Sequence, residues 1–335
     1  MTGSIKVVIV GGVACGPKTA ARLKRLKPDA EITLLDKGKV LSYGACGLPY
    51  YVEGRFERLD ALVETPLGVK RDPVFFRKVK GFEALTETEA VRIDRTTKTV
   101  EVVSRADGAS RTLSYDKLVL ATGASPVRLS FPGIDLEGVH FMHHLDDAAA
   151  VRTLADQGRV RKATIVGAGL IGLEMCEALA SKGVHVTIVE MLPTVMGLLL
   201  DEEMGRLAMR HLAAKGVSLR MGETVSALEG DGQGRLVRVR TSAGVIESDL
   251  CLLAVGVRPN SALAAQAGLA VDARGGILIN PFCQTSDPDI YAGGDCVANA
   301  CVHDLSGSRI FAPQGSTSNK HGRIIANHIA GLAEP

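Results

Sequence analysis

Two glycine-rich turns in this sequence have the residue pattern of a dinucleotide-binding site. The first turn, Gly11–Gly16, follows the apolar run Ile5–Val10 and precedes a helix expected over Lys18–Leu26. Glycines in such a turn let the backbone approach a pyrophosphate, and the helix N-terminus offers unpaired N–H groups and a positive dipole end. The next expected strand, Ile32–Asp36, ends in an acid that can accept hydrogen bonds from a ribose diol. This segment therefore predicts a bound dinucleotide.

The same pattern occurs a second time, which makes it much more specific than one glycine-rich turn alone. Gly167–Gly172 matches the full GxGxxG pattern and lies between an expected strand, Ala163–Val166, and an expected helix, Leu173–Ser181. The strand after that helix, Val186–Glu190, again ends in an acid. The first turn is looser, because Val13 stands at the middle glycine position, and the adjacent Gly12 is expected to supply the missing room. Two dinucleotide sites in one chain suggest that electrons pass between two cofactors.

A single cysteine near the first unit is a candidate redox residue. Cys46 lies in the stretch Ser42–Tyr51, soon after Asp36, and has no cysteine partner nearby. A lone thiol can cycle two electrons by pairing with a non-protein sulfur, and a helix beginning near Gly47 would favour the thiolate form through its dipole. The remaining cysteines are expected to be inert core residues, although the first lies within the first turn: Cys15, Cys176, Cys251, Cys283, Cys296 and Cys301.

Composition limits the classes of function. The net charge of +2 and the 13 aromatic residues without tryptophan argue against a nucleic-acid partner. No apolar run reaches the roughly 18 residues needed to span a bilayer, and the N-terminus lacks a targeting signal. Seven cysteines without CxxC spacing indicate reduced thiols in a cytoplasmic protein, and the histidines show no spacing typical of a metal site.

Expected strands and helices alternate along the whole chain. Further strands are expected at Val100–Val103, Lys117–Ala121, Asp249–Val255 and Ile290–Ala292, and a last helix at Asn319–Leu332. The sequence predicts an α/β protein with two doubly wound, Rossmann-like dinucleotide-binding domains, the second inserted in the first. We expect residues 1–150 and 261–335 to form the domain that binds the first dinucleotide, and residues 151–260 to bind the second.

Three further segments carry a family resemblance. Asp289–Asp295 resembles the second flavin fingerprint of the pyridine nucleotide-disulfide oxidoreductase family, and Ala121–Gly123 and Val255–Asn260 are similar to further hallmarks of it. The resemblance implies an FAD- and NAD(H)-dependent enzyme, with FAD on the first unit and NAD(H), most simply NADH, on the second. The residues implied to bind FAD are Gly11, Gly12, Gly16, Asp36, Lys37, Ala121, Thr122, Gly123, Gly294, Asp295, Ser316, Thr317 and Ser318. Those implied to bind NAD(H) are Gly167, Gly169, Leu170, Ile171, Gly172, Glu174, Glu190 and Gly256.

The segment around Cys46 resembles the single-cysteine branch of that family. This branch contains coenzyme A-disulfide reductases, NADH oxidases and peroxidases, and NADH-dependent persulfide and polysulfide reductases. The resemblance implies Cys46 as the catalytic residue and a small sulfur compound as the partner. A coenzyme A substrate would be held by basic residues near the first helix, although an exposed basic face is equally often only solvated. The candidate substrate contacts are Lys18, Arg22, Arg25, Ser42 and Lys78, with Arg77 and Lys80 beside the last of them.

Two other functions remain open on the sequence. One is an NADH oxidase or peroxidase in which Cys46 cycles through a sulfenic acid. The other is a non-catalytic FAD/NADH module that passes electrons to a protein partner. The branch normally continues into a C-terminal domain that forms a homodimer, and this sequence ends at Pro335, so we expect that interface domain to be absent here and turnover of coenzyme A disulfides to be weak.

Overall fold

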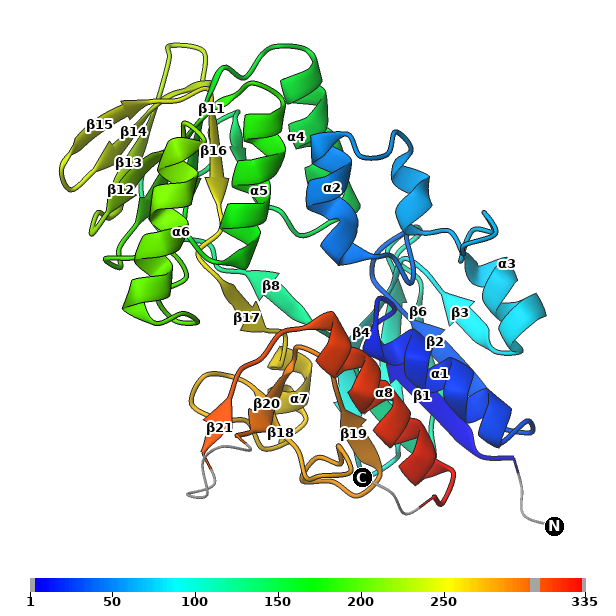
Figure 1. Cartoon of the computed structure of the whole chain (residues 1–335). Coiled ribbons are helices and arrows are strands. Elements are labelled where there is room, and N and C mark those ends of the chain that lie inside the picture. Colours follow the sequence, from blue (N-terminus) through cyan, green and yellow to red (C-terminus); the bar gives the residue numbers. More distant parts are fainter. Residues whose placement is uncertain (1–3, 302–307, 333–335) are drawn as a thin grey trace. The chain divides into compact units, whose positions relative to one another are not determined.

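The structure is a computed structural model that describes residues 4–301 and 308–332 (Figure 1). The chain divides into two compact units. Unit one consists of Met1–Gly44, Val63–Ser125 and Arg258–Pro335, and unit two consists of Ala45–Leu62 and Pro126–Val257. The chain crosses between them within β8 (Ala124–Pro126) and β17 (Val257–Pro259), as well as near residues 44 and 62. Unit two is therefore inserted in unit one, as the sequence predicted.

The limits of the two units differ from the predicted boundaries at residues 150 and 260. Residues 126–150 belong to unit two, because β9 (Val139–His140) pairs with a strand of the sheet in unit two. Residues 45–62, which carry Cys46, also belong to unit two. Leu48 and Val52 explain this, since both are buried in the hydrophobic core of unit two. The burial of these two side chains was not foreseen from their place in the sequence.

Unit one contains a five-stranded parallel sheet. Its strand order is β19 (Ile290–Ala292), β7 (Lys117–Leu120), β1 (Lys6–Val10), β2 (Glu31–Leu35) and β3 (Glu83–Leu85). These strands are short runs of β-branched and aliphatic residues that are buried almost throughout, as is typical of a parallel sheet covered on both faces. The register pairs the last residue of β1 with the last residues of both β2 and β7. The three strands therefore end level at one edge of the sheet.

Helices from opposite ends of the chain pack together in unit one. α1 (Cys15–Leu26) and α8 (Gly315–Ile329) lie side by side, as Figure 1 shows. Both begin earlier than predicted, because the first turn of a helix tolerates Gly and Pro, whose missing side chain or N–H is not needed there. The shorter helical segments of unit one are α3 (Pro73–Phe75), the π-helix η3 (Phe76–Lys80) and α7 (Ala262–Gln266).

Unit one also contains two small sheets. One is antiparallel and is formed by β4 (Thr88–Asp94), β5 (Thr99–Ser104) and β6 (Ser110–Ser114). The other joins β18 (Ile277–Leu278), β20 (Val297–Ala300) and β21 (Arg309–Ile310). The predicted strand at 100–103 lies within β5, so its apolar residues pack in an antiparallel sheet and not in the doubly wound one.

Unit two repeats the parallel architecture. Its five-stranded sheet has the order β12 (Ser218–Met221), β11 (His185–Glu190), β10 (Lys162–Val166), β16 (Leu250–Leu253) and β9. Each neighbouring pair is parallel. The last residue of β10 pairs with Val189 of β11 and with the last residue of β16. The sheet thus has the same level edge as that of unit one, and the predicted α/β class is confirmed.

The helices of unit two are α2 (Leu48–Glu53), α4 (Leu145–Asp156), α5 (Leu170–Ser181) and α6 (Glu202–Ala214). Two 3₁₀ turns, η1 (Ala45–Gly47) and η2 (Leu59–Leu62), flank α2 and the loop after it. An antiparallel sheet of β13 (Val225–Gly230), β14 (Leu236–Thr241) and β15 (Gly244–Glu247) completes the unit. Across residues 4–301 and 308–332, no helix has both the length and the apolar character required to cross a bilayer.

Candidate functional site

The level edge of the sheet in unit one brings together segments that the sequence placed far apart. Gly11, Asp36 and Ala121 follow directly after β1, β2 and β7, which end side by side. Gly293 follows β19 at the same edge, and its N–H donates to the carbonyl of Leu120 at 3.0 Å. Ligands of doubly wound sheets bind outside the carboxyl ends of the strands. This edge is therefore the candidate dinucleotide site of unit one.

Asp36 is fixed against the first glycine turn by two hydrogen bonds. Its Oδ2 accepts from the Gly12 N–H and its Oδ1 accepts from the Gly38 N–H, both at 2.7 Å. The carboxylate is half-buried and each oxygen keeps a lone pair beyond these bonds. It is thus oriented at the mouth of the turn and can still accept hydrogen bonds from a diol.

Glu190 repeats this arrangement in unit two. Its Oε2 accepts from the Ala168 N–H at 2.7 Å and its Oε1 accepts from the Leu192 N–H at 2.9 Å. In both units the acid after the second strand therefore binds the second residue of the glycine turn and the residue two positions beyond itself. The sequence repeat thus extends to individual hydrogen bonds.

Four glycines of the two turns lie where the backbone leaves no space for a side chain. A Cβ on Gly11 would lie 2.0 Å from the Ala121 carbonyl oxygen, and one on Gly167 would lie 2.4 Å from the Ala254 oxygen; both residues have a positive φ. A Cβ on Gly16 or Gly172 would lie about as close to the first glycine of its own turn. The fold itself therefore demands these four glycines.

Gly169 differs from these four glycines, because the fold leaves open space beside it. A Cβ on Gly169 would meet no described atom within 4 Å, so the fold does not demand a glycine there. Gly169 is the N-cap of α5, and because glycine has no side chain it cannot accept from the first N–H groups of the helix. Leu170 and Ile171 beside it are exposed. The open space and the uncapped helix start fit a pyrophosphate. Ala14, at the start of α1, also makes no side-chain cap.

The segment after β19 is a second candidate part of the dinucleotide site in unit one. The Ser318 hydroxyl on α8 donates to Asp295 Oδ1 at 3.0 Å, and the Gly294 N–H donates to His321 Nδ1 at 3.2 Å. Burial raises the pKa of Asp295, and the bond from Ser318 opposes that rise. The structure thus joins the predicted residues 294, 295 and 318, while Ser316 is exposed and Thr317 half-buried in the first turn of α8.

The Ala121–Gly123 turn is held by a residue that the sequence did not single out. The Thr122 hydroxyl donates to the Asn260 carbonyl at 2.5 Å, and Asn260 Nδ2 donates to the Thr122 carbonyl at 2.9 Å. Ser125 also donates to the side chain of Asn260. Asn260 belongs to the stretch 255–260 that carried the resemblance, so the signal was present, but its contacts depend on the tertiary fold.

Cys46 is the exposed thiol of this chain. It lies in η1, and α2 begins two residues later at Leu48, which agrees with the helix expected near Gly47. Five of the other cysteines are buried and Cys301 is half-buried. Burial raises the pKa of Cys176 to about 11 and those of Cys251 and Cys283 to about 12, which keeps these thiols protonated. All seven cysteines lie among the described residues, and Cys46 is therefore the exposed one.

The candidate substrate-binding residues lie in different environments. Arg22 donates from Nε to Asn327 Oδ1 of α8 at 2.6 Å, and a Cβ on Gly322 would lie 2.9 Å from the Cβ of Lys18. These two side chains therefore face α8, whereas Arg25 and Lys78 are exposed. Ser42 has a left-handed φ of 51° and its N–H donates to the Gly12 carbonyl.

The structure also places the remaining predicted binding residues Lys37, Glu174 and Gly256. Lys37 and Glu174 are exposed, next to Asp36 and on α5 respectively. Gly256, after β16, has a φ of +98° and open space where a Cβ would be. In the part of the chain that the structure describes, no group of three His, Cys, Asp or Glu side chains could hold a metal ion.

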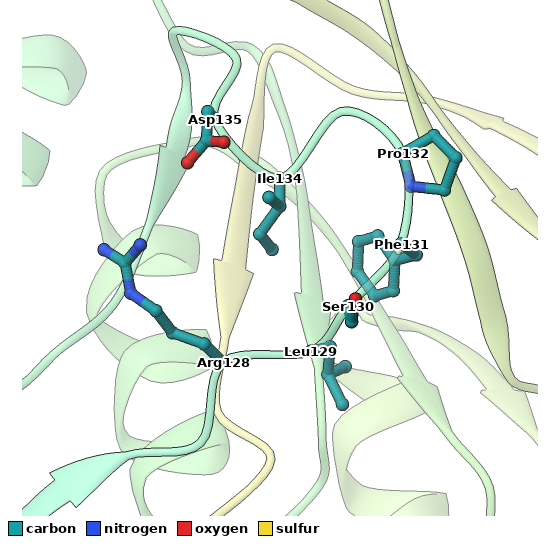
Figure 2. Close-up of a pocket in the computed structure, with 7 residues that line it drawn as sticks. All are labelled: Arg128, Leu129, Ser130, Phe131, Pro132, Ile134 and Asp135. Atoms are coloured by element: carbon teal, nitrogen blue, oxygen red, sulfur yellow. The ribbon is translucent and has the colours of Figure 1, made fainter.

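A separate hollow of about 510 Å³ lies on unit two (Figure 2). It is formed by the loop before β9, and the cation of Arg128 lies 5.3 Å from the ring centre of Phe141. The hollow does not involve the glycine turns. The residues lining it are Arg128, Leu129, Ser130, Phe131, Pro132, Ile134 and Asp135.

Comparison with known proteins assigns these features to a family. Residues 5–318 match the model of the pyridine nucleotide-disulphide oxidoreductases, which covers both glycine turns and the Asp295 segment. The chain belongs to this family. As a pyridine nucleotide-disulphide oxidoreductase it depends on FAD and NAD(H), which confirms the predicted family and cofactors.

Three relatives indicate the branch. The solved structure of an NAD-dependent persulfide reductase from A. fulgidus superposes with a TM-score of 0.93 at 41% identity over 98% of this chain. An NAD(P)H coenzyme A polysulfide/persulfide reductase from Pyrococcus horikoshii is 34% identical over 97% of this chain, and an NADH oxidase from Methanocaldococcus jannaschii is 31% identical over 98%. The chain spans 59% of the A. fulgidus chain and 70% of each of the other two.

Proposed function

We propose that this chain is an FAD-dependent NADH oxidoreductase that reduces low-molecular-weight persulfides, polysulfide or coenzyme A disulfides. The observation that carries the proposal is the exposure of Cys46 in a chain whose other thiols are buried or half-buried. The same chain has two candidate dinucleotide sites at its glycine turns. The persulfide reductases among its relatives support the sulfur substrate. The seven free thiols favour a reducing, cytoplasmic location.

The residues of unit one are suited to hold FAD. Asp36 would accept hydrogen bonds from the adenosine ribose, and the start of α1 would face the pyrophosphate. Asp295, held by Ser318, would accept from the ribityl hydroxyls, and the start of α8 would face the flavin pyrimidine. The chemistry that a bound flavin supplies is hydride acceptance from NADH and electron delivery to sulfur.

The residues of unit two are suited to hold NADH. Gly169 leaves room for the pyrophosphate at the start of α5, and Glu190 would accept from both ribose hydroxyls of the adenosine. A carboxylate at this place repels a 2′-phosphate, and Met191–Pro193 offers no cation to neutralise one. The geometry therefore favours NADH over NADPH.

Cys46 would carry the sulfur chemistry. Its thiolate attacks a disulfide or persulfide sulfur, which forms a Cys46–S–S–R bond and breaks the substrate S–S bond, releasing one thiolate. Two electrons and one proton, together the hydride equivalent of NADH, then cleave the mixed disulfide into the Cys46 thiolate and a second thiol. Solvent protonates the thiolate released in the first step, so the net reaction consumes one NADH and one further proton for each disulfide.

The substrate class within this reaction is proposed from the basic residues of unit one. The exposed Arg25 and Lys78 would contact the phosphates of a coenzyme A group, whereas Lys18 and Arg22 face α8 and are not proposed as contacts. The name of the P. horikoshii relative, which includes coenzyme A, supports this substrate class. Arg25→Ala and Lys78→Ala should raise the KM for coenzyme A disulfide without changing the KM for inorganic polysulfide.

Anaerobic titration with NADH tests the proposal. The purified protein should be yellow, and NADH should bleach the flavin absorbance. Addition of coenzyme A persulfide, coenzyme A disulfide or polysulfide should restore that absorbance, while cystine serves as an unrelated disulfide. A preparation that cannot be reconstituted with FAD, or bleached flavin that no sulfur compound reoxidises, would contradict it.

A second candidate is an NADH oxidase in which Cys46 cycles through a sulfenic acid. The M. jannaschii relative favours it. The two functions differ in acceptor, since the oxidase consumes oxygen in step with NADH and the reductase consumes NADH without oxygen. Oxygen uptake measured beside thiol release therefore separates them.

A further inference from the structure

The segment that carries Asp295 is held by two side chains from one face of α8. Ser318 donates to Asp295 Oδ1 at 3.0 Å, and His321 Nδ1 lies 3.2 Å from the Gly294 nitrogen. Ser318 and His321 are three residues apart, so they lie one turn apart on the same side of the helix. Two adjacent residues, 294 and 295, are thus bound by one backbone and one side-chain contact to the same helix.

The contact to Gly294 determines the protonation of His321. A backbone N–H can only donate, so Nδ1 must be the unprotonated, accepting nitrogen. The proton of the neutral ring then resides on Nε2. A doubly protonated ring has no acceptor and would turn an N–H toward the N–H of Gly294. The hydrogen bond therefore exists only while His321 is neutral.

The surroundings of His321 favour this neutral form. Burial lowers its pKa from the ordinary value of 6.5. A Cβ on Gly293 would lie 2.9 Å from the His321 Cβ, which shows how closely α8 approaches this segment. The titratable groups on the facing segments are Asp295 and Cys296 after β19 and Cys15 and Lys18 on α1, and Lys320 and Arg323 are exposed on α8 itself.

The neighbouring groups do not offset this preference. Burial raises the pKa of both Cys15 and Cys296, so these thiols are neutral at pH 7. Asp295 is bound by Ser318. The side-chain stem of Lys18 packs against Gly322, one residue along α8, where a Cβ would lie 2.9 Å from the Lys18 Cβ.

We propose that His321 is a positioning residue for the flavin site. Its neutral Nδ1 fixes the Gly294 amide and so holds the next residue, Asp295, where its carboxylate can accept from the ribityl chain of FAD. The proposal rests on the proposed role of Asp295. Protonation of His321 removes the acceptor, and FAD affinity falls as the pH decreases.

The lowered pKa of His321 makes FAD binding weaker at acidic pH. The unfolded chain has a His321 pKa near 6.5, and the folded chain has a lower one. The stabilisation by neutral His321 is therefore complete above pH 6.5 and is lost progressively as the pH falls below 6.5 toward the folded value. FAD retention should follow the folded pKa, which lies below 6.5.

Three variants test the proposal on the FAD-loaded protein. His321→Gln offers an amide oxygen as acceptor and does not titrate. His321→Leu has no hydrogen-bond acceptor and does not titrate. His328→Gln is the matched control, because His328 lies on the same helix with its Nδ1 2.8 Å from the Tyr291 hydroxyl. The readout is the rate of FAD release on dilution, followed by flavin fluorescence between about pH 5 and pH 8.

The expected results differ for each protein. The wild type and His328→Gln should release FAD faster as the pH falls through the folded pKa of His321, which lies below 6.5. His321→Gln should hold FAD at pH 7.5 and lose that pH dependence. At pH 7.5 His321→Leu should release FAD about tenfold faster than the wild type, which corresponds to one hydrogen bond, and this difference should shrink at low pH, where the wild type has lost the same bond. Far-UV circular dichroism of each apoprotein checks that it is folded.

Two results would overturn the proposal. One is an FAD release rate for folded His321→Leu equal to that of the wild type. The other is an unchanged pH dependence in His321→Gln, which also decides the matter if the leucine variant does not fold. A wild type that binds no FAD at all would instead refute the proposed function, so the two failures are distinguishable.

Discussion

The guanidinium of Arg152 lies over the ring of Tyr51, 4.4 Å from its centre, and also donates to the Tyr51 carbonyl at 3.2 Å. The same nitrogen donates to the carbonyls of Phe56 at 2.8 Å and Glu57 at 3.3 Å. The Nε of Arg152 forms an ion pair with Asp156 Oδ2 at 3.2 Å, four residues along α4. One largely buried arginine thus fixes the segment that follows Cys46 within unit two.

This arrangement predicts the behaviour of Arg152→Ala. The substitution removes the donor to three carbonyls, and the loss should lower the free energy of unfolding by about 1–3 kcal/mol. The freed segment should also make Cys46 react several-fold faster with a thiol reagent such as dithionitrobenzoate. Urea denaturation and the kinetics of the fast-reacting thiol measure both effects.

Arg55→Ala is the control for that experiment. Arg55 is in the same segment, and its side chain is 65% exposed and paired with Glu53 at 2.8 Å. Exposed ion pairs contribute little, so this variant should resemble the wild type in both measurements. Equal thiol kinetics in Arg152→Ala and Arg55→Ala would show that Arg152 does not position the Cys46 segment.

The two kinds of glycine in the second turn should respond differently to alanine. Gly169→Ala meets no protein atom within 4 Å, so thermal stability should stay at the wild-type level. Its methyl group would occupy the space proposed for the pyrophosphate, and NADH affinity should fall tenfold or more. Calorimetry and fluorescence titration with NADH measure the two quantities.

Gly172→Ala provides the contrast. Its Cβ would lie 2.1 Å from the Gly167 carbonyl oxygen, so the protein should be destabilised whether or not NADH is present. If Gly169→Ala binds NADH as tightly as the wild type, the cradle of unit two does not hold the pyrophosphate.

Glu190 should decide the choice of nicotinamide nucleotide. The wild type should prefer NADH over NADPH by about 1–3 kcal/mol, the range expected when a buried partner is left unsatisfied. Glu190→Ala should reduce the ratio of kcat/KM values, mainly through a higher KM for NADH. Equal efficiency of the wild type with both nucleotides would remove Glu190 from this role.

Cys46→Ser should separate the two halves of the proposed reaction. A serine hydroxyl cannot form a mixed disulfide, so turnover of sulfur substrates should fall below detection. Bleaching of the flavin by NADH needs no sulfur and should keep its rate. Cys301→Ser is the control, because Cys301 is the half-buried thiol and has no proposed role. Unchanged sulfur turnover in Cys46→Ser would exclude Cys46 from the mechanism.

The sequence by itself determined the repeated units. Local patterns identified both glycine turns, and the expected strand at 5–10 and the observed β1 share their last residue. The acid after the second strand could be paired with its turn from spacing alone, and the hydrogen bonds of Asp36 and Glu190 agree with that interpretation. These features are local, because a βαβ unit sets its own register through apolar periodicity and glycine placement.

Only the tertiary structure decided the rest. The segment with Cys46 belongs to unit two because Leu48 and Val52 are buried there and Arg152 binds its carbonyls, contacts that span about a hundred residues of sequence. His321 binds Gly294 across 27 residues of sequence, and Asn260 binds Thr122 across 138. A hydrogen bond between distant side chain and backbone leaves no periodic trace in the sequence, because it depends on where the fold brings two chain segments together.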